Sequence, residues 1–235
     1  MTEQEGTFGK FVCDTLLQES CQRDNPFEDL FSKQSFALNG AQREILSGSS
    51  GVSRILPCLY LCGAGAARPE IMTQLGVTLV INVAPELPDT PLPDPTPAYM
   101  RVAILDKGEN DILQHFDDVT ERIHAERHRG GVTLIHCVAG VSRSTSFCLA
   151  YLVRHLQMTL RDAFLYVKAT RPQIRPNVGF FHQLISYEAT QLGLTTVSMI
   201  FIEAIAREVP DVYAPQYTAM EEFYRKHRKH ARRRD

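Results

Sequence analysis

The chain has 235 residues, of which 44% are apolar and 22% charged, and its formal net charge is −2. This length and apolar content predict one domain of roughly 160 residues with extensions, because a domain of that size buries roughly 70% of its unfolded-chain surface. No apolar run reaches the roughly 18 residues of a membrane-spanning helix, so we expect no membrane span.

The amino-terminal end shows no targeting signal. It begins Met-Thr-Glu-Gln-Glu, which is acidic and leads into no apolar stretch, so we expect no signal peptide. Thr2 stands where N-myristoylation requires glycine, so we expect no such anchor. The six cysteines show neither metal-ligand spacing nor a regular disulfide framework. These features together predict a reducing location, cytoplasmic and/or nuclear.

Residues 1–50 have a mixed composition, and we expect a partly disordered N-terminal extension. Apolar residues recur with helical spacing between residues 8 and 16, and a second short helix could begin at Asn25-Pro26. The run Ser-Gly-Ser-Ser-Gly at 47–51 is typical of a flexible linker.

Strand and helix patterns alternate from residue 52 onward. Strands are expected at residues 53–56, 58–62, 77–82, 99–104 and 131–135, with a proline-rich loop at 85–97. Helices are expected at residues 67–75, from Ile112 through Ile123, at 144–155, from Thr159 onward, and from Asn177 to near Gly193. This alternation predicts an α/β fold with a mixed sheet flanked by helices.

Residues 136–144 carry the most informative motif, His-Cys-Val-Ala-Gly-Val-Ser-Arg-Ser. A thiolate at Cys137 and a guanidinium at Arg143 can meet one small anion from two sides. The residues between them can curl so that their backbone N–H groups form a nest for phosphate oxygens. Gly140 can take the positive φ that such a loop needs. The expected strand before the loop and helix after it complete an anion site at a helix N-terminus.

The same arrangement predicts a reactive thiol at Cys137. A helix N-terminus and a nearby cation can lower a cysteine pKa to roughly 3.5–7.5. Ser144 places a hydroxyl where it can donate a hydrogen bond to the sulfur. The side chain of His136 is expected to point to the opposite side of the strand end, because successive strand residues alternate. We therefore interpret His136 as a residue that supports the loop rather than as a base.

This nonapeptide resembles the signature of cysteine-dependent protein phosphatases, and its Ala-Gly-Val-Ser-Arg-Ser part resembles the dual-specificity branch. The resemblance implies the mixed sheet flanked by helices of that family. It also implies that phosphate is held by Arg143 and by backbone N–H groups of the loop, which comprises Val138, Ala139, Gly140, Val141, Ser142 and Arg143.

Phosphoryl transfer to a thiolate expels an alkoxide or phenoxide, so a second catalytic residue must supply a proton. Asp106 lies just past an extended apolar segment, about 30 residues before Cys137, and its surroundings resemble the general-acid loop of the family. Asp111 is the competing candidate, but it directly precedes a helical pattern and is better explained as an N-cap. Glu109 is interpreted as a solvated loop charge.

Residues 169–184 give a third match, to the Arg-Pro…Pro-Asn-x-Gly-Phe segment of the family. Asn177 is placed both to cap the next helix and to hydrogen-bond the phosphate loop. Arg175 is a candidate for contacting a peptide or a second phosphate at the rim of the site. The alternative for this segment is an ordinary loop with a proline-defined turn.

The resemblance covers about residues 52–213. Within the family, the chain resembles the short atypical dual-specificity phosphatases, specifically the group that contains MAP kinase phosphatase 6. This resemblance implies a catalytic domain at 52–193 and a family-like extension at 194–213. Residues 214–235 would form a basic tail, helical or disordered.

Residues 225–235 alone carry a charge of +6, whereas the rest of the chain carries −8. Such a block can bind an acidic partner or an import receptor, or can be a solvated helix end.

The sequence thus predicts a protein phosphatase that acts on phosphotyrosine and on phosphoserine or phosphothreonine through a cysteinyl-phosphate intermediate, without a metal or organic cofactor. Its partners would be phosphoprotein substrates, and MAP kinases are those that the resemblance suggests. One alternative is a phosphoprotein-binding scaffold with little turnover. Another is a lipid or RNA phosphatase, which the basic tail favours and the uncharged loop disfavours.

Overall fold

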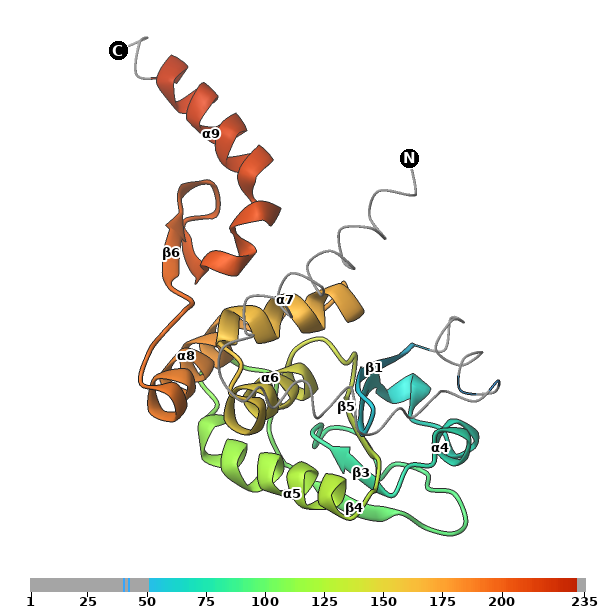
Figure 1. The fold of residues 1–235 in the computed structure, drawn as a ribbon. Coiled ribbons are helices and arrows are strands. Elements are labelled where there is room, and N and C mark those ends of the chain that lie inside the picture. The colour runs from blue at the N-terminus through green and yellow to red at the C-terminus, as the bar shows by residue number, and fades with distance from the viewer. Residues whose placement is uncertain (1–39, 41, 43–50, 232–235) are drawn as a thin grey trace.

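The computed structural model describes residues 40, 42 and 51–231, and its centre is a five-stranded sheet of order β1-β2-β5-β3-β4 (Figure 1). β1 is antiparallel to β2, and the other neighbouring pairs are parallel. The expected mixed α/β fold is therefore confirmed. The strands are β1 Val52–Leu56, β2 Leu59–Gly63, β3 Leu79–Asn82, β4 Ala98–Arg101 and β5 Thr133–Cys137.

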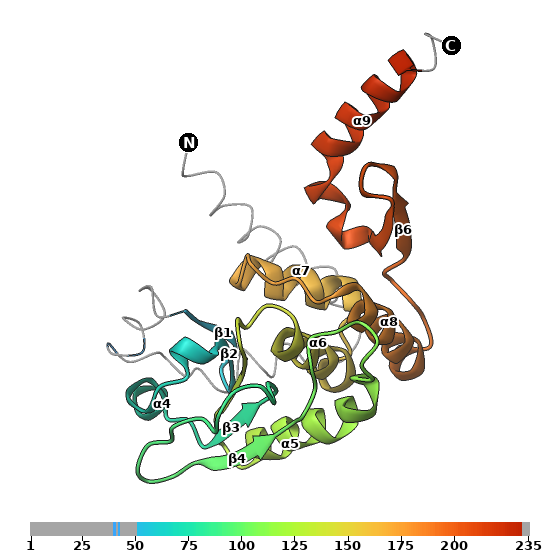
Figure 2. The same cartoon turned by 180° about the vertical axis from the view of Figure 1, so that it is seen from behind.

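Helices cover both faces of this sheet. The α-helices are α4 Pro69–Leu75, α5 Phe116–His128, α6 Arg143–Leu156, α7 Leu160–Thr170, α8 Val178–Leu192 and α9 Thr218–Ala231, and the short 3-10 helices are η1 Ala64–Ala66, η2 Leu113–His115, η3 Glu203–Ile205 and η4 Asp211–Gln216. Helix α4 lies on one side of the sheet, and α5 to α8 lie on the other (Figure 2). Among the described residues, no helix is long and apolar enough to cross a membrane.

The side-chain alternation of β5 decides which face carries the motif. Leu134 packs into the apolar cluster under α4, whereas Ile135 and Cys137 belong to the larger cluster with α5 to α8. Because all five residues of β5 are buried and the strand is paired on both edges, its end is fixed in position. The sheet therefore presents Cys137 toward the N-terminus of α6.

Two expected caps are present, and two expected boundaries differ. Thr159 accepts a hydrogen bond from the backbone of the first turn of α7, and Asn177 does the same for α8. β4 ends at Arg101 rather than near residue 104, because its partner β3 ends at Asn82. The helix expected from Ile112 begins with the 3-10 turn η2 and becomes α-helical at its fifth residue.

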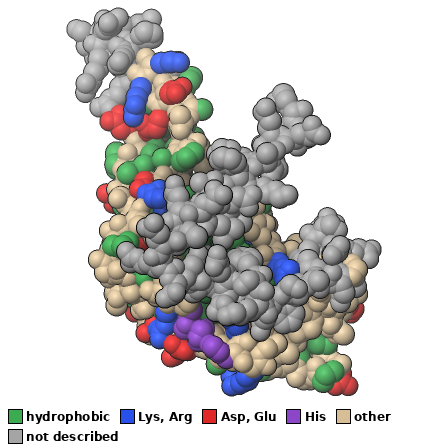
Figure 3. Space-filling model, viewed as in Figure 1, with side chains coloured by type: hydrophobic (Ala, Val, Ile, Leu, Met, Phe, Trp, Pro, Cys, Tyr) green, Lys and Arg blue, Asp and Glu red, His purple; other side chains and the backbone are tan. Residues whose placement is uncertain are grey.

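The hydrophobic core continues beyond α8, the last helix of the catalytic domain expected at residues 52–193. The antiparallel pair β6 (Met199–Ile202) and β7 (Arg207–Pro210) follows α8. The core residues contributed by this region are Val197, Ile202, Val209 and Tyr213. Helix α9 then extends away from the sheet, with acidic and basic side chains side by side near its exposed end (Figure 3). The helices expected before residue 40 and most of the expected linker lie outside the described residues.

Candidate active site

The loop that joins β5 to α6, called the phosphate loop below, is shaped by Gly140, whose φ is 65°. A Cβ at this position would lie 2.4 Å from the backbone oxygen of Cys62, so any other residue would be both strained and obstructed. Arg171 holds the loop from the end of α7: its Nε donates to the Gly140 oxygen at 2.7 Å and its Nη2 to the Ala139 oxygen at 3.1 Å. The positive φ of Gly140 was expected from the sequence, whereas the contact made by Arg171 has no local sequence signal.

Cys137 lies at the floor of this loop with 2% of its surface exposed. Its Sγ accepts hydrogen bonds from the backbone N–H of Gly140 and from the hydroxyl of Ser144, each at 3.2 Å. Burial, the largest single effect, raises the pKa of the thiol, but these hydrogen bonds and those from the backbone of Ser144 and Val141 together hold the pKa below its usual value. The loop therefore favours the thiolate.

Arg143, the first residue of α6, presents a fixed guanidinium to the same space. Its Nη1 and Nη2 donate to the two carboxylate oxygens of Glu86 at 2.7 and 2.6 Å, and Nη1 also donates to the Ile104 oxygen at 3.2 Å. This pairing lowers the pKa of the Glu86 carboxyl. The buried Nε has no hydrogen-bond partner among the described residues, so it remains available to an anion. Glu86 could not be predicted from the sequence, because it lies in the proline-rich loop outside any motif.

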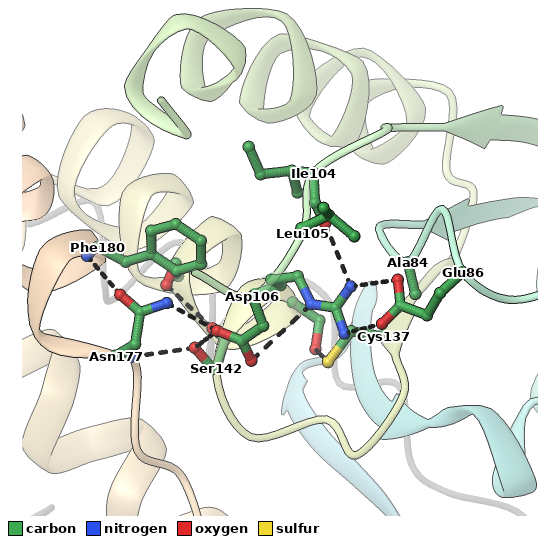
Figure 4. A network of polar contacts seen from close by, with 12 residues as sticks. Ala84, Glu86, Ile104, Leu105, Asp106, Cys137, Ser142, Asn177 and Phe180 are labelled. Atoms are coloured by element: carbon green, nitrogen blue, oxygen red, sulfur yellow. Dashed lines mark hydrogen bonds and ion pairs between the residues drawn. The ribbon is translucent and has the colours of Figure 1, made fainter. Parts of the chain in front are cut away.

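Asp106 reaches the site from the opposite side to Glu86 (Figure 4). Its Oδ1 accepts hydrogen bonds from the Ser142 hydroxyl at 2.8 Å and from the Asn177 side-chain amide at 2.7 Å. Its Oδ2 lies 3.9 Å from the Nε of Arg143. Oδ1 is therefore held by two neighbours, whereas Oδ2 is turned toward the guanidinium of Arg143.

A contact between two glycines fixes the loop that carries Asp106. A Cβ at Gly179, in the first turn of α8, would lie only 2.1 Å from the Gly108 oxygen. Asp111, the competing acid, accepts a hydrogen bond from the backbone of Gln114 at 3.2 Å and does not line the cavity. Glu109 is exposed and does not line it either.

The remaining predicted residues differ in their relation to the cavity: His136 does not line it, whereas Asn177 and Arg175 do. His136 is buried away from the cavity and bonds the Thr90 hydroxyl at 2.7 Å, and burial lowers its pKa. The backbone N–H of Asn177 donates to the Ser142 hydroxyl at 3.0 Å. Arg175 is exposed at the rim, and its backbone N–H donates to the Val141 oxygen at 2.8 Å.

These groups surround one cavity of about 570 Å³. It is lined by Glu86, Asp106, Cys137, Val138, Ala139, Val141, Ser142, Arg143, Arg175 and Asn177. A thiolate, a guanidinium and inward backbone N–H groups at the floor suit a tetrahedral anion, and a carboxyl at the rim suits proton transfer to a departing oxygen. The described residues hold no cluster of His, Cys, Asp and Glu suited to a metal ion.

Comparison with known proteins gives one consistent family. The model of the dual specificity phosphatase catalytic domain matches residues 59–190. Human dual specificity protein phosphatase 18 is 39% identical over 172 residues, which cover 73% of this chain and 89% of the relative. Human dual specificity protein phosphatase 14 is 39% identical over 175 residues, which cover 74% of this chain and 86% of the relative.

Solved structures agree with the sequence relatives. Human DUSP28 is 37% identical with a TM-score of 0.57, covering 60% of this chain and 94% of that chain. The human tyrosine phosphatase-like serine/threonine/tyrosine-interacting protein is 33% identical with a TM-score of 0.56, covering 60% of this chain and 97% of that chain.

Proposed function

Because the chain belongs to the dual specificity phosphatase family, we propose that Cys137 is the nucleophile that takes phosphate from protein side chains. The observation that carries this proposal is the lowered pKa of a buried thiol that lies in one cavity with a guanidinium and a carboxyl. A thiolate is the nucleophilic form of cysteine, and the substrate phosphate is the group that such a cavity fits.

In the first step, the Cys137 thiolate attacks phosphorus in line with the leaving oxygen. A sulfur–phosphorus bond forms as the phosphorus–oxygen bond to the substrate breaks. Arg143 and the backbone N–H groups of residues 138–143 bind the equatorial oxygens, where charge develops. Asp106 gives its proton to the departing oxygen, which leaves as a neutral hydroxyl group.

In the second step, water attacks the cysteinyl phosphate. Asp106, now a carboxylate, accepts a proton from that water while the phosphorus–sulfur bond breaks and inorganic phosphate is released. The Ser144 hydroxyl, 3.2 Å from the sulfur, donates to the departing thiolate. The pairing of Glu86 with Arg143 keeps the guanidinium in one orientation through both steps.

The lining of the loop supports a substrate with one phosphate. Its variable side chains, those of Val138, Ala139, Val141 and Ser142, are all uncharged, so they offer no cations for further phosphates. A phosphorylated tyrosine, serine or threonine side chain meets this condition better than a phosphoinositide does. We propose proteins of MAP kinase pathways as substrates, on the strength of the resemblance to the short atypical group.

The basic run at residues 225–235 belongs to a different proposal, because none of its described residues lines the cavity. Their charge of +6 suits an acidic partner or an import receptor, and we propose a cytoplasmic and/or nuclear location for the protein. Attraction of this kind weakens with added salt, because exposed charges act over only about 8 Å at physiological ionic strength.

The test of the catalytic proposal compares wild type with Cys137→Ser on an aryl phosphate, on peptides with phosphotyrosine or phosphothreonine, and on a phosphoinositide. Wild type should hydrolyse both peptides and leave the phosphoinositide largely intact. Cys137→Ser should lose turnover, because a serine hydroxyl has no comparable ionised form at neutral pH. Residual hydrolysis within about tenfold of wild type would refute the assignment, since loss of a nucleophile costs far more than that.

The physiological substrate requires a trapping experiment. Asp106→Ala should form the Michaelis complex but transfer phosphate slowly, so phosphoproteins bound to it can be identified. A wild-type chain that binds phosphopeptides but hydrolyses no aryl phosphate would instead support the phosphoprotein-binding scaffold.

A further inference from the structure

The segment that follows β7 is anchored in the core beside the phosphate loop. Tyr213, in η4, is 1% exposed, and its ring lies 5.6 Å from that of Phe164 and 5.4 Å from that of Phe181, measured between centroids. Its hydroxyl donates to the Pro176 oxygen at 2.7 Å. This segment lies beyond residues 59–190, the part that the family model matches. The C-terminal segment therefore packs against the loop that carries Arg175.

The guanidinium of Arg175 is held by the same segment. Its Nη1 donates to the side-chain oxygen of Gln216 and its Nη2 to the hydroxyl of Tyr217. Its Cζ lies 5.0 Å from the ring centroid of Tyr213 and 5.6 Å from that of Tyr217, within the range of cation–π attraction. Two aromatic rings and two acceptors thus restrict a side chain that would otherwise sample many rotamers.

Arg175 is at the same time part of the mouth of the cavity. Its backbone N–H donates to the Val141 oxygen of the phosphate loop at 2.8 Å, and its side chain lines the cavity that contains Cys137. Within the described part of the chain, no carboxylate forms an ion pair with it. A guanidinium has five N–H donors, and Gln216 and Tyr217 together take two of them. An exposed cation with free donors therefore lies beside the phosphate site.

We propose that Tyr217 and Gln216 are positioning residues that determine specificity by holding Arg175 at the rim, where its guanidinium binds an acidic side chain beside the phosphorylated residue of a substrate. This inference rests on the proposed function, because it concerns the same cavity. It assigns to the C-terminal segment one wall of the substrate site. Changes in this segment should therefore affect protein substrates more than small ones.

The test uses two phosphotyrosine peptides that differ only in their flanks, two glutamates or two glutamines on each side. For the full-length wild type, kcat/KM should favour the glutamate peptide by about fivefold, the upper range for an exposed ion pair. Arg175→Gln should bring this ratio close to one. Tyr217→Phe keeps the ring but removes the acceptor hydroxyl, and it should lower the ratio by about twofold or more. Both substitutions should act by raising KM for the glutamate peptide and should leave kcat unchanged, because Arg175 does not touch phosphorus.

Tyr224→Phe is the matched control, since it removes a tyrosine hydroxyl from α9 that makes no contact with Arg175. Its ratio should equal that of wild type. Equal kcat/KM for the two wild-type peptides, or a preference that survives Arg175→Gln, would overturn the inference. A fall in kcat for both peptides in Tyr217→Phe would also overturn it, because the segment would then act on the phosphate loop. Turnover of an aryl phosphate by wild type keeps these results separate from a failure of the proposed function.

Discussion

The hydrogen bond from Ser144 to the Cys137 sulfur should be measurable as a pKa. The Oγ–Sγ distance is 3.2 Å, and both residues are buried, so no water replaces the hydroxyl when it is removed. A hydrogen bond to a charged group contributes about 1.5–3 kcal/mol, and one pKa unit corresponds to about 1.4 kcal/mol. Ser144→Ala should therefore raise the pKa of the Cys137 thiol by about one to two units.

The direction of this pKa change follows from the protonation state of Cys137 that the hydrogen bond stabilises. Ser144 donates to the thiolate, so its loss favours the protonated thiol, and a higher pH is needed to ionise it. The rate of alkylation by iodoacetamide, followed against pH for the Cys137 peptide by mass spectrometry, reports the thiolate fraction directly. Burial raises the pKa of Cys62 to about 12 and also raises that of Cys148, so these two thiols should react little in the same range.

Thr145→Val is the matched control for this experiment. Thr145 is the next residue of α6, is fully buried, and its hydroxyl has no hydrogen-bond partner among the described residues. The substitution removes a hydroxyl of the same helix turn without touching the sulfur. The midpoint of alkylation should stay at the wild-type pH. If Ser144→Ala had the same midpoint as Thr145→Val, the role given to this hydrogen bond would be wrong.

Three other changes have definite expected outcomes. Asp106→Asn should lower kcat by about 10²–10⁴ for substrates with poor leaving groups and much less for an aryl phosphate with a good one; equal losses would mean a structural role. Gly179→Ala should displace the loop at Gly108 and lower kcat by up to about 10²-fold, the scale of a 1 Å misplacement, whereas Gly65→Ala, with open space around it, should not. Deletion of residues 225–235 should leave kcat and KM on a small aryl phosphate nearly unchanged and alter location or salt-sensitive binding; a several-fold loss of kcat would place the tail against the catalytic site.

The sequence by itself determined the features that depend on near neighbours. The strand, loop and helix around residues 136–144 could be predicted because each rests on local periodicity and on the spacing of Cys137, Gly140 and Arg143. The positive φ of Gly140 and the caps formed by Thr159 and Asn177 belong to the same class. Each of these features involves residues only a few positions apart, so a linear motif can specify it.

Only the tertiary structure decided which distant residues complete the site. Glu86 pairs with Arg143, from which it is 57 positions away in the sequence. Arg171, which holds the phosphate loop, also donates to the oxygen of Gly51, 120 positions before it. The extension of the core past α8, and the approach of Tyr217 to Arg175 across 42 positions, arise in the same way. These contacts have no local signal, because they depend on how helices pack on the sheet and not on the order of residues along the chain.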